Sequence, residues 1–324
     1  MTKGSSKNKK RVIPNRKLLV LSVGFSALLI CGFLAYRVLF QNQVTKFSLK
    51  AAIVDQLSQN SPDVTFNATA TNLLRNAGFT VSYFNSENVS VPFYEKLVEG
   101  DYGIIIFRAH SAMRVDEPIV DLFTSEEYDV NKYPQYTSTG LLSRAQYLVP
   151  FLPETNKSYF AITPNFVQHF GSFPKSVIIA MGCSSLNVTG MAQAFINRGA
   201  TAYVGWTNIV LPNDTDYETT KFLEMFLSEN KTLGISIKAT YPPRNYYDPN
   251  KGIRVFSWMD FYPVNQSIDE LKISDLIAEA GKSNTAMALN NTEQFSFVIA
   301  NINFQRESHL TGCIEATSQL LVTS

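Results

Sequence analysis

Two short apolar runs in the chain each lead into a residue that could take part in nucleophilic chemistry. Residues 104–107 precede His110 and Ser111, and residues 177–181 precede Cys183. A cysteine attacks a carbonyl as its thiolate, and a nearby imidazole supplies either the base or the ion-pair partner. If the two runs are neighbouring strands of a parallel sheet, about 4.8 Å apart, His110 and Cys183 project from the same edge.

The elements around these two runs predict an α/β fold with three layers and a mainly parallel sheet. Short β-rich apolar runs alternate with amphipathic segments, a pattern typical of a parallel sheet that helices cover on both faces. The expected strands cover 51–54, 80–84, 104–107, 159–162, 177–181 and 202–205, the strand at 159–162 being placed at an edge; the expected helices cover 69–77, 91–98, 189–197 and 216–227.

Composition and the apolar pattern divide the chain into five expected parts, one of which contains an insertion. The segment at 113–152 is poorly periodic and rich in Tyr, Ser, Thr and Pro, so we interpret it as an insertion or lid. Beyond 262 we expect a helix at 268–280 and a strand at 295–302, without a place in the sheet. The parts are a basic tail (1–17), a transmembrane helix (18–40), a linker (41–50), the α/β domain (51–262) with the 113–152 insertion inside it, and a C-terminal extension (263–324).

The segment 18–40 has the length and composition of a membrane anchor. Residues 18–36 are uncharged and mostly apolar, and at about 1.5 Å rise per residue 18–40 spans a hydrocarbon core of about 30 Å. The run is longer than the h-region of a cleaved signal peptide and lacks a small-residue cleavage site. Seven Lys and Arg with no acidic residue precede it, which predicts a cytoplasmic N-terminus and an extracytoplasmic domain.

Charge and glycosylation motifs agree with an exterior location. After the anchor segment the chain carries 20 Lys and Arg against all 27 Asp and Glu, so the domain is net negative and nucleic acid is not an expected partner. Composition alone predicts roughly four Asn-X-Ser/Thr motifs, whereas the chain holds eight. A surface that is merely rich in Asn, Ser and Thr is the alternative explanation. The motifs begin at Asn67, Asn88, Asn156, Asn187, Asn213, Asn230, Asn265 and Asn290.

The two strand ends and the segment after Cys183 resemble a known family. The strand ending in His110-Ser111, the strand ending in Gly182-Cys183-Ser184, and the helix-to-strand segment at 191–207 are similar to the caspase–gingipain–legumain class of cysteine peptidases, which has bacterial and archaeal members. The similarity extends over about 51–241. It implies a caspase-like fold and a membrane-anchored prokaryotic member of that class.

The resemblance implies a role for each of these residues. Cys183 would be the nucleophile and His110 the general acid/base, while backbone N–H groups near Ser111 and Cys183 would hold the oxyanion. The family has glycine directly after the histidine, where this chain has Ser111, and a glycine-only conformation would not survive that change. Asp55 and Trp206 are candidates for the substrate pocket, with Asp55 favouring Arg or Lys before the scissile bond.

The expected function is therefore an extracytoplasmic cysteine endopeptidase that needs no cofactor or metal and acts on polypeptides outside the cytoplasm. The alternative is a catalytically inactive surface module that keeps the fold for binding or structure. Each residue also has a structural explanation: Asp55 as a turn cap, Trp206 as core packing, and Cys183 as a small core residue or a disulfide partner of Cys313.

Overall fold

The computed structural model describes residues 47–114, 116–146, 157–248 and 252–287. The expected anchor (18–40) and the expected strand at 295–302 lie outside these residues. In the part of the chain that is described, no helix is long and apolar enough to cross a membrane. The chain divides into a first compact unit ending at Asn284 and a second at 285–324, and the description below concerns the first.

A six-stranded sheet forms the centre of the first unit, and it is mostly parallel, as the sequence predicts. Its strand order is β12-β9-β8-β3-β1-β2, and only β12 runs antiparallel to its neighbour, β9. The fold is therefore α/β with a mixed sheet. The strands are β1 (Lys50–Asp55), β2 (Thr80–Asn85), β3 (Ile104–Arg108), β8 (Val177–Ala180), β9 (Ala202–Trp206) and β12 (Met259–Tyr262).

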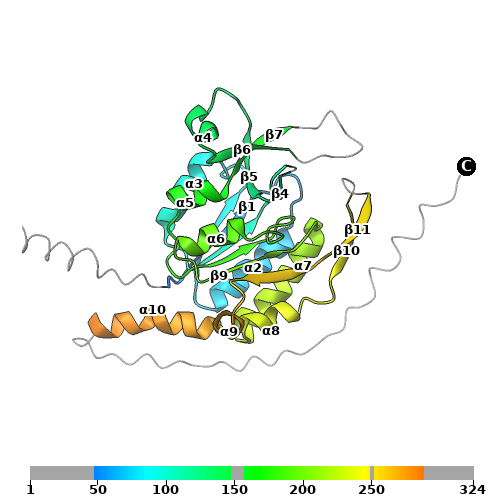
Figure 1. Ribbon diagram of the computed structural model, residues 1–324. Coiled ribbons are helices and arrows are strands. Elements are labelled where there is room, and N and C mark those ends of the chain that lie inside the picture. The colour runs from blue at the N-terminus through cyan, green and yellow to red at the C-terminus, as the bar shows by residue number, and fades with distance from the viewer. Residues whose placement is uncertain (1–46, 115, 147–156, 249–251, 288–324) are drawn as a thin grey trace, which may run out of the picture. The chain divides into compact units, whose positions relative to one another are not determined.

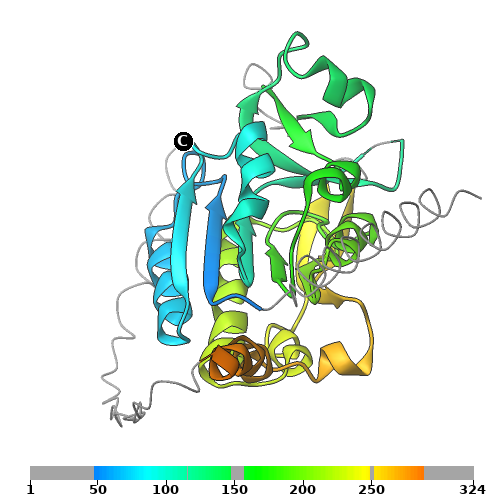
Figure 2. The same cartoon turned by 90° about the vertical axis from the view of Figure 1, so that its left-hand side faces the viewer.

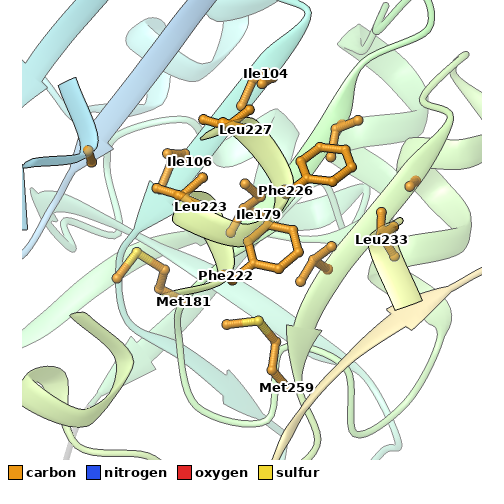
Figure 3. Close-up of a cluster of buried hydrophobic side chains, with 14 of the residues drawn as sticks. Ile104, Ile106, Ile179, Met181, Phe222, Leu223, Phe226, Leu227, Leu233 and Met259 are labelled. Carbon is orange, nitrogen blue, oxygen red and sulfur yellow. The ribbon is translucent and has the colours of Figure 1, made fainter. Parts of the chain in front are cut away.

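Helices cover both faces of this sheet because successive strand residues point to opposite sides. One hydrophobic cluster joins the sheet to α2 and α7, and the other joins it to α3, α5 and α6, so the sheet lies between two helical layers (Figures 1 and 2). Figure 3 shows the first cluster, where Phe222 and Phe226 face Ile179. The helices are α2 (Val64–Asn76), α3 (Val91–Leu97), α5 (Pro164–Phe170), α6 (Gly190–Asn197) and α7 (Pro212–Leu223), which a π-helical turn (Glu224–Ser228) extends.

The segment expected as an irregular insertion contains regular structure. It supplies two strands, β5 and β6, and a short helix, and together with β4, which ends at Met113, and β7 these strands form a second, antiparallel sheet in the order β4-β5-β7-β6. The expectation that 159–162 is an edge strand is wrong, because β7 lies between β5 and β6. The elements are β4 (Ser111–Met113), β5 (Val120–Glu127), α4 (Pro134–Ser138), β6 (Leu142–Gln146) and β7 (Ser158–Ile162).

The region after α7 is also more ordered than its weak sequence pattern indicates. A hairpin precedes β12, and two helices beyond residue 262 pack on the main core through Ile268, Ile273 and Leu276. These residues join the extension to the same compact unit as the α/β domain, at least as far as Asn284. The elements are α8 (Leu233–Lys238), β10 (Arg244–Asp248), β11 (Ile253–Ser257), α9 (Gln266–Asp269) and α10 (Ile273–Met287).

Candidate active site

The strands that lead to His110 and Cys183 are direct neighbours. β3 and β8 pair in parallel, and the last matched residues are Phe107 and Ala180. His110 and Cys183 each lie three residues beyond that pair. The prediction that the two strands place His110 and Cys183 at one edge of the sheet is therefore confirmed for the main chain.

The two chain segments after these strands touch each other at Gly182. A Cβ atom built on Gly182 would lie 2.3 Å from Ser111 Oγ and 2.5 Å from the carbonyl oxygen of Ala109. Only glycine permits such an approach, because a real Cβ atom would overlap both oxygens. The Ser111 hydroxyl also donates a hydrogen bond to the Cys183 carbonyl oxygen at 2.7 Å.

The main chain of His110 is fixed on both sides. Its N–H donates to Gln56 Oε1 at 3.1 Å, and its carbonyl oxygen accepts from the Phe123 N–H at 3.0 Å. The imidazole ring lies over Phe123 with ring centroids 5.8 Å apart. Burial, together with the nearby Arg108 charge, lowers the pKa of His110 to about 4. The imidazole is thus neutral near pH 7 and able to accept a proton.

Cys183 is a partly buried free thiol in the described structure. Its Sγ lies 3.4 Å from the Val210 carbonyl oxygen and 3.5 Å from the Val210 nitrogen. Burial raises the pKa of the thiol, and the hydrogen bonds to its sulfur offset only part of that effect. The resting pair is therefore a neutral thiol and a neutral imidazole. Of the two partnerships that the sequence leaves open, this favours the general base over the ion pair.

The main chains of His110 and Cys183 lie side by side, but their side chains contact different neighbours. The His110 ring packs on Phe123 of the antiparallel sheet, whereas the Cys183 sulfur meets Val210 in the loop before α7. Proton transfer between them requires hydrogen-bond reach, directly or through one water, and apo sites often reach that geometry only with substrate bound.

Ser111 stands where the similar peptidases have glycine, but its backbone conformation is one that serine adopts without strain. It lies in the extended strand β4, and it is not among the residues with positive φ. Because the Phe123 N–H donates to the His110 carbonyl, the alternation of an antiparallel ladder turns the Ser111 N–H away from β5. That N–H lies on the side of Gly182, whose Cβ position is 2.7 Å from Ser111 N. A backbone donor at this position is consistent with the expected oxyanion role.

The residue after the nucleophile has an unusual backbone conformation. Ser184 has φ of 55°, in the left-handed region that serine seldom adopts. Its N–H donates to the Asn208 carbonyl at 2.8 Å, and the Ser185 N–H donates to Gly182 O. The chain therefore turns sharply after Cys183. Strained residues of this kind occur often at functional sites.

Asp55 does end β1 at the same edge, but its carboxylate is fully buried. One oxygen accepts from Arg108 Nη1 at 2.7 Å, and the other accepts from Asn67 Nδ2 and the Tyr83 hydroxyl. Arg108 is also fully buried and binds Asp216 of α7 through two hydrogen bonds. Asp55 therefore binds the guanidinium of Arg108 and not, as expected, an Arg or Lys of the substrate.

Trp206 belongs to the hydrophobic core on the α2 and α7 side of the sheet. It is only 2% exposed. A substrate would not reach its ring or the Asp55 carboxylate without rearrangement of the surrounding side chains. The placement of Trp206 agrees with core packing, whereas the Asp55 carboxylate is neither in an open pocket nor a turn cap: its partners are Arg108, Asn67 and Tyr83.

Three residues of the site, Arg108, Asp216 and Val210, were not predicted from the sequence. A charged residue directly after four apolar strand residues was a signal for Arg108, because a buried cation needs a buried partner. Asp216 and Val210 had no comparable signal, since only the folded chain brings the start of α7 beside β3 and Cys183. Within the described residues, no group of three or more His, Cys, Asp or Glu side chains could hold a metal ion.

Comparison with known proteins identifies no relative that would assign a function to these residues. No protein-family model matches the chain, and neither does any curated protein sequence. The arguments about function therefore depend on the site itself.

Proposed function

We propose that the chain is a cysteine endopeptidase with a caspase-like fold, in which His110 and Cys183 form the catalytic dyad. The observation that carries the proposal is the pairing of β3 with β8, which ends in the contact between Ser111 and Cys183. A strand-end histidine beside a strand-end cysteine, at the carboxyl edge of a parallel sheet, is suited to acyl transfer.

The reaction would follow from the neutral resting state of the two groups. As the Cys183 sulfur attacks the scissile carbonyl carbon, His110 takes the thiol proton, and the carbonyl oxygen becomes an oxyanion near the N–H groups of Ser111 and Cys183. Collapse breaks the carbon–nitrogen bond, and His110 returns the proton to the departing amine. Water then attacks the thioester carbonyl while His110 accepts one of its protons. Collapse breaks the carbon–sulfur bond, His110 returns the proton to the Cys183 sulfur, and the product leaves as a carboxylic acid that ionises in solvent.

We also propose that the enzyme is anchored in the membrane by residues 18–40 and acts on polypeptides outside the cytoplasm. The basic N-terminal tail, the long apolar run and the eight glycosylation motifs support this location. The lipid bilayer is then the partner of the N-terminal segment, and the net negative charge of the domain makes nucleic acid an unexpected partner.

The test is peptide cleavage by the full chain in detergent or lipid, with single substitutions at the dyad. We expect Cys183→Ala to abolish turnover and His110→Gln to lower kcat/KM by about 10²–10⁴-fold. His169→Gln is the matched control, because His169 is an exposed histidine outside the site. Full activity of the Cys183→Ala protein would refute the proposal.

The dependence of activity on pH separates the general-base mechanism from a preformed ion pair. With the pKa of His110 near 4 and the pKa of the Cys183 thiol raised, kcat/KM should be lost only as the pH falls toward 4. A preformed ion pair would instead lose kcat/KM as the pH rises, because the imidazolium that stabilises the thiolate would give up its proton. A rate that falls as the pH drops through about 6.5 would indicate a solvent-exposed histidine with its ordinary pKa.

A binding module without catalysis is the second candidate, and the position of the sulfur favours it. Cys183 Sγ is engaged by the main chain of Val210 and has a raised pKa, as expected of a structural cysteine. In that case the purified wild-type chain would cleave no peptide, and Cys183→Ala would leave binding of its partner unchanged.

A further inference from the structure

The hydrogen bond from Ser111 to the Cys183 carbonyl joins the segment of the general base to the segment of the nucleophile. The donor oxygen and the acceptor oxygen lie 2.7 Å apart, and Ser111 is buried, with 6% of the residue exposed. We propose that Ser111 is a positioning residue, whose hydroxyl holds the Cys183 main chain so that the sulfur keeps a defined orientation. The expected effect on kcat rests on the proposed function, whereas the tether between Ser111 and Cys183 does not.

The residue at 182 makes room for this hydroxyl. A Cβ atom on Gly182 would be 2.3 Å from Ser111 Oγ, well inside contact distance. A side chain at 111 and a side chain at 182 therefore exclude each other. Because position 182 has none, Ser111 can point toward Cys183 while its own main chain stays in the extended conformation of β4.

The hydrogen bond fixes the peptide plane that follows the nucleophile. Ser111 holds the carbonyl of that peptide, and the Asn208 carbonyl accepts from its N–H, which belongs to Ser184. With both polar ends of one peptide unit held, the positive φ of Ser184 is stabilised and the Cys183 sulfur is directed to Val210. Loss of one tether would let the peptide plane rotate and would move the sulfur.

A small displacement of a nucleophile has a large effect on catalysis. Misplacement of a reacting group by about 1 Å can cost about 10²-fold in rate. The Ser111 hydroxyl itself is engaged with Cys183 O, so its removal should affect the orientation of the nucleophile and leave substrate affinity largely unchanged. This is a reduction of kcat with little change of KM.

The experiment compares Ser111→Ala, which removes the hydroxyl, with Ser111→Thr, which keeps it, in the full chain. Two quantities are measured for each protein: the second-order rate of Cys183 alkylation by iodoacetamide at pH 8, and kcat and KM for peptide cleavage. We expect Ser111→Ala to raise the alkylation rate at least threefold, because the sulfur leaves Val210, and to lower kcat by about 10–100-fold at unchanged KM. Ser111→Thr should restore both quantities to within about threefold of the wild type.

The alkylation rate keeps this inference separate from the peptidase proposal, because it needs no turnover. If the wild type cleaves no peptide but Ser111→Ala still alkylates faster and Ser111→Thr does not, the tether is present and the peptidase proposal fails. If Ser111→Ala matches the wild type in alkylation, or if Ser111→Ala and Ser111→Thr behave alike, the tether is refuted. Thermal unfolding of each variant confirms that the folded protein is being compared.

Discussion

At the scale of single residues, the half-buried imidazole of His110 links the stability of the fold to pH. Its pKa is lowered to about 4 in the folded chain, against about 6.5 in an unfolded one, so the unfolded chain binds the proton more tightly. The neutral ring therefore contributes stability that is present above pH 6.5 and lost as the pH falls to 4. At 1.36 kcal/mol per pKa unit the loss is on the order of 3 kcal/mol.

Urea unfolding between pH 7 and pH 4 measures this linkage. We expect His110→Gln to remove a large part of the decline in the free energy of unfolding, whereas the exposed control His169→Gln should leave it unchanged. Equal pH dependence in both variants would show that the His110 ring is solvated in the folded chain.

The buried cation Arg108 gives a second prediction at this scale. Its guanidinium holds the carboxylates of Asp55 and Asp216, and it also donates to the Ser61 carbonyl at 2.7 Å. Arg108→Met leaves two buried carboxylates without their cation, so we expect a loss of about 3–5 kcal/mol in the free energy of unfolding. Denaturant titration measures it. The matched control is Arg144→Met, which alters an exposed arginine of β6, and a comparable loss there would contradict the interpretation.

At the scale of elements, the close approach of the two strand ends depends on Gly182. We expect Gly182→Ala to separate the ends of β3 and β8, because the new methyl group would overlap the Ala109 carbonyl and Ser111 Oγ. Its cost should be about 1–3 kcal/mol, typical of overpacking, with loss of peptide cleavage. Gly140→Ala is not an equivalent control, since its φ is positive; Ser138→Ala in the exposed helix α4 is a suitable one. A Gly182→Ala protein that is as stable as the wild type would contradict the packing described here.

The parallel strands of the central sheet could be predicted from the sequence, but β12 could not, and β7 was the only strand of the antiparallel sheet that was predicted. Strands β1, β3 and β8 each contain an uninterrupted apolar run of four residues, the pattern of a parallel strand buried on both faces. In β5, Asp121 interrupts the apolar run, and it is nevertheless buried because Arg114 and Ser143 donate to its carboxylate. The local sequence around Asp121 does not show that Arg114 and Ser143 bind it, so the burial of this strand could not be predicted.

The same limit applies to the candidate site. The order of His110 and Cys183 and the apolar runs before them predicted a shared sheet edge, because strand ends follow from local pattern and topology. The partnership of Asp55 with Arg108 depends on the register of β1 against β3, in which these two residues lie opposite each other. Register is set by the packing of the folded sheet, so the sequence could not distinguish a pocket carboxylate from a buried ion pair.

At the scale of the whole molecule, the glycosylation motifs differ in what a glycan would disturb. A glycan replaces one hydrogen of the Asn Nδ2 and leaves the amide oxygen available. Asn230 and Asn265 are exposed and use their Oδ1 atoms as acceptors, from the Ser274 N–H and the Ile268 N–H respectively. Asn67 instead donates from Nδ2 both to Asp55 and to the Tyr83 hydroxyl, beside the buried Arg108 network. A modified Asn67 would lose one of these bonds and would place a sugar within this network.

If the domain is exported as proposed, the folded protein should carry glycans at Asn230 and Asn265 and none at Asn67. The full chain is produced in a glycosylating secretory host, and the folded fraction is treated with a glycosidase that converts each modified Asn to Asp, which peptide mass mapping detects. Asn67→Gln should weaken the fold without changing glycan mass, whereas Asn265→Gln should remove one glycan and also the helix cap of α9. A glycan on Asn67 in folded material would contradict the buried network. A chain with no glycan at all would argue against an exterior domain, because accessible motifs are modified when a chain passes through the secretory route.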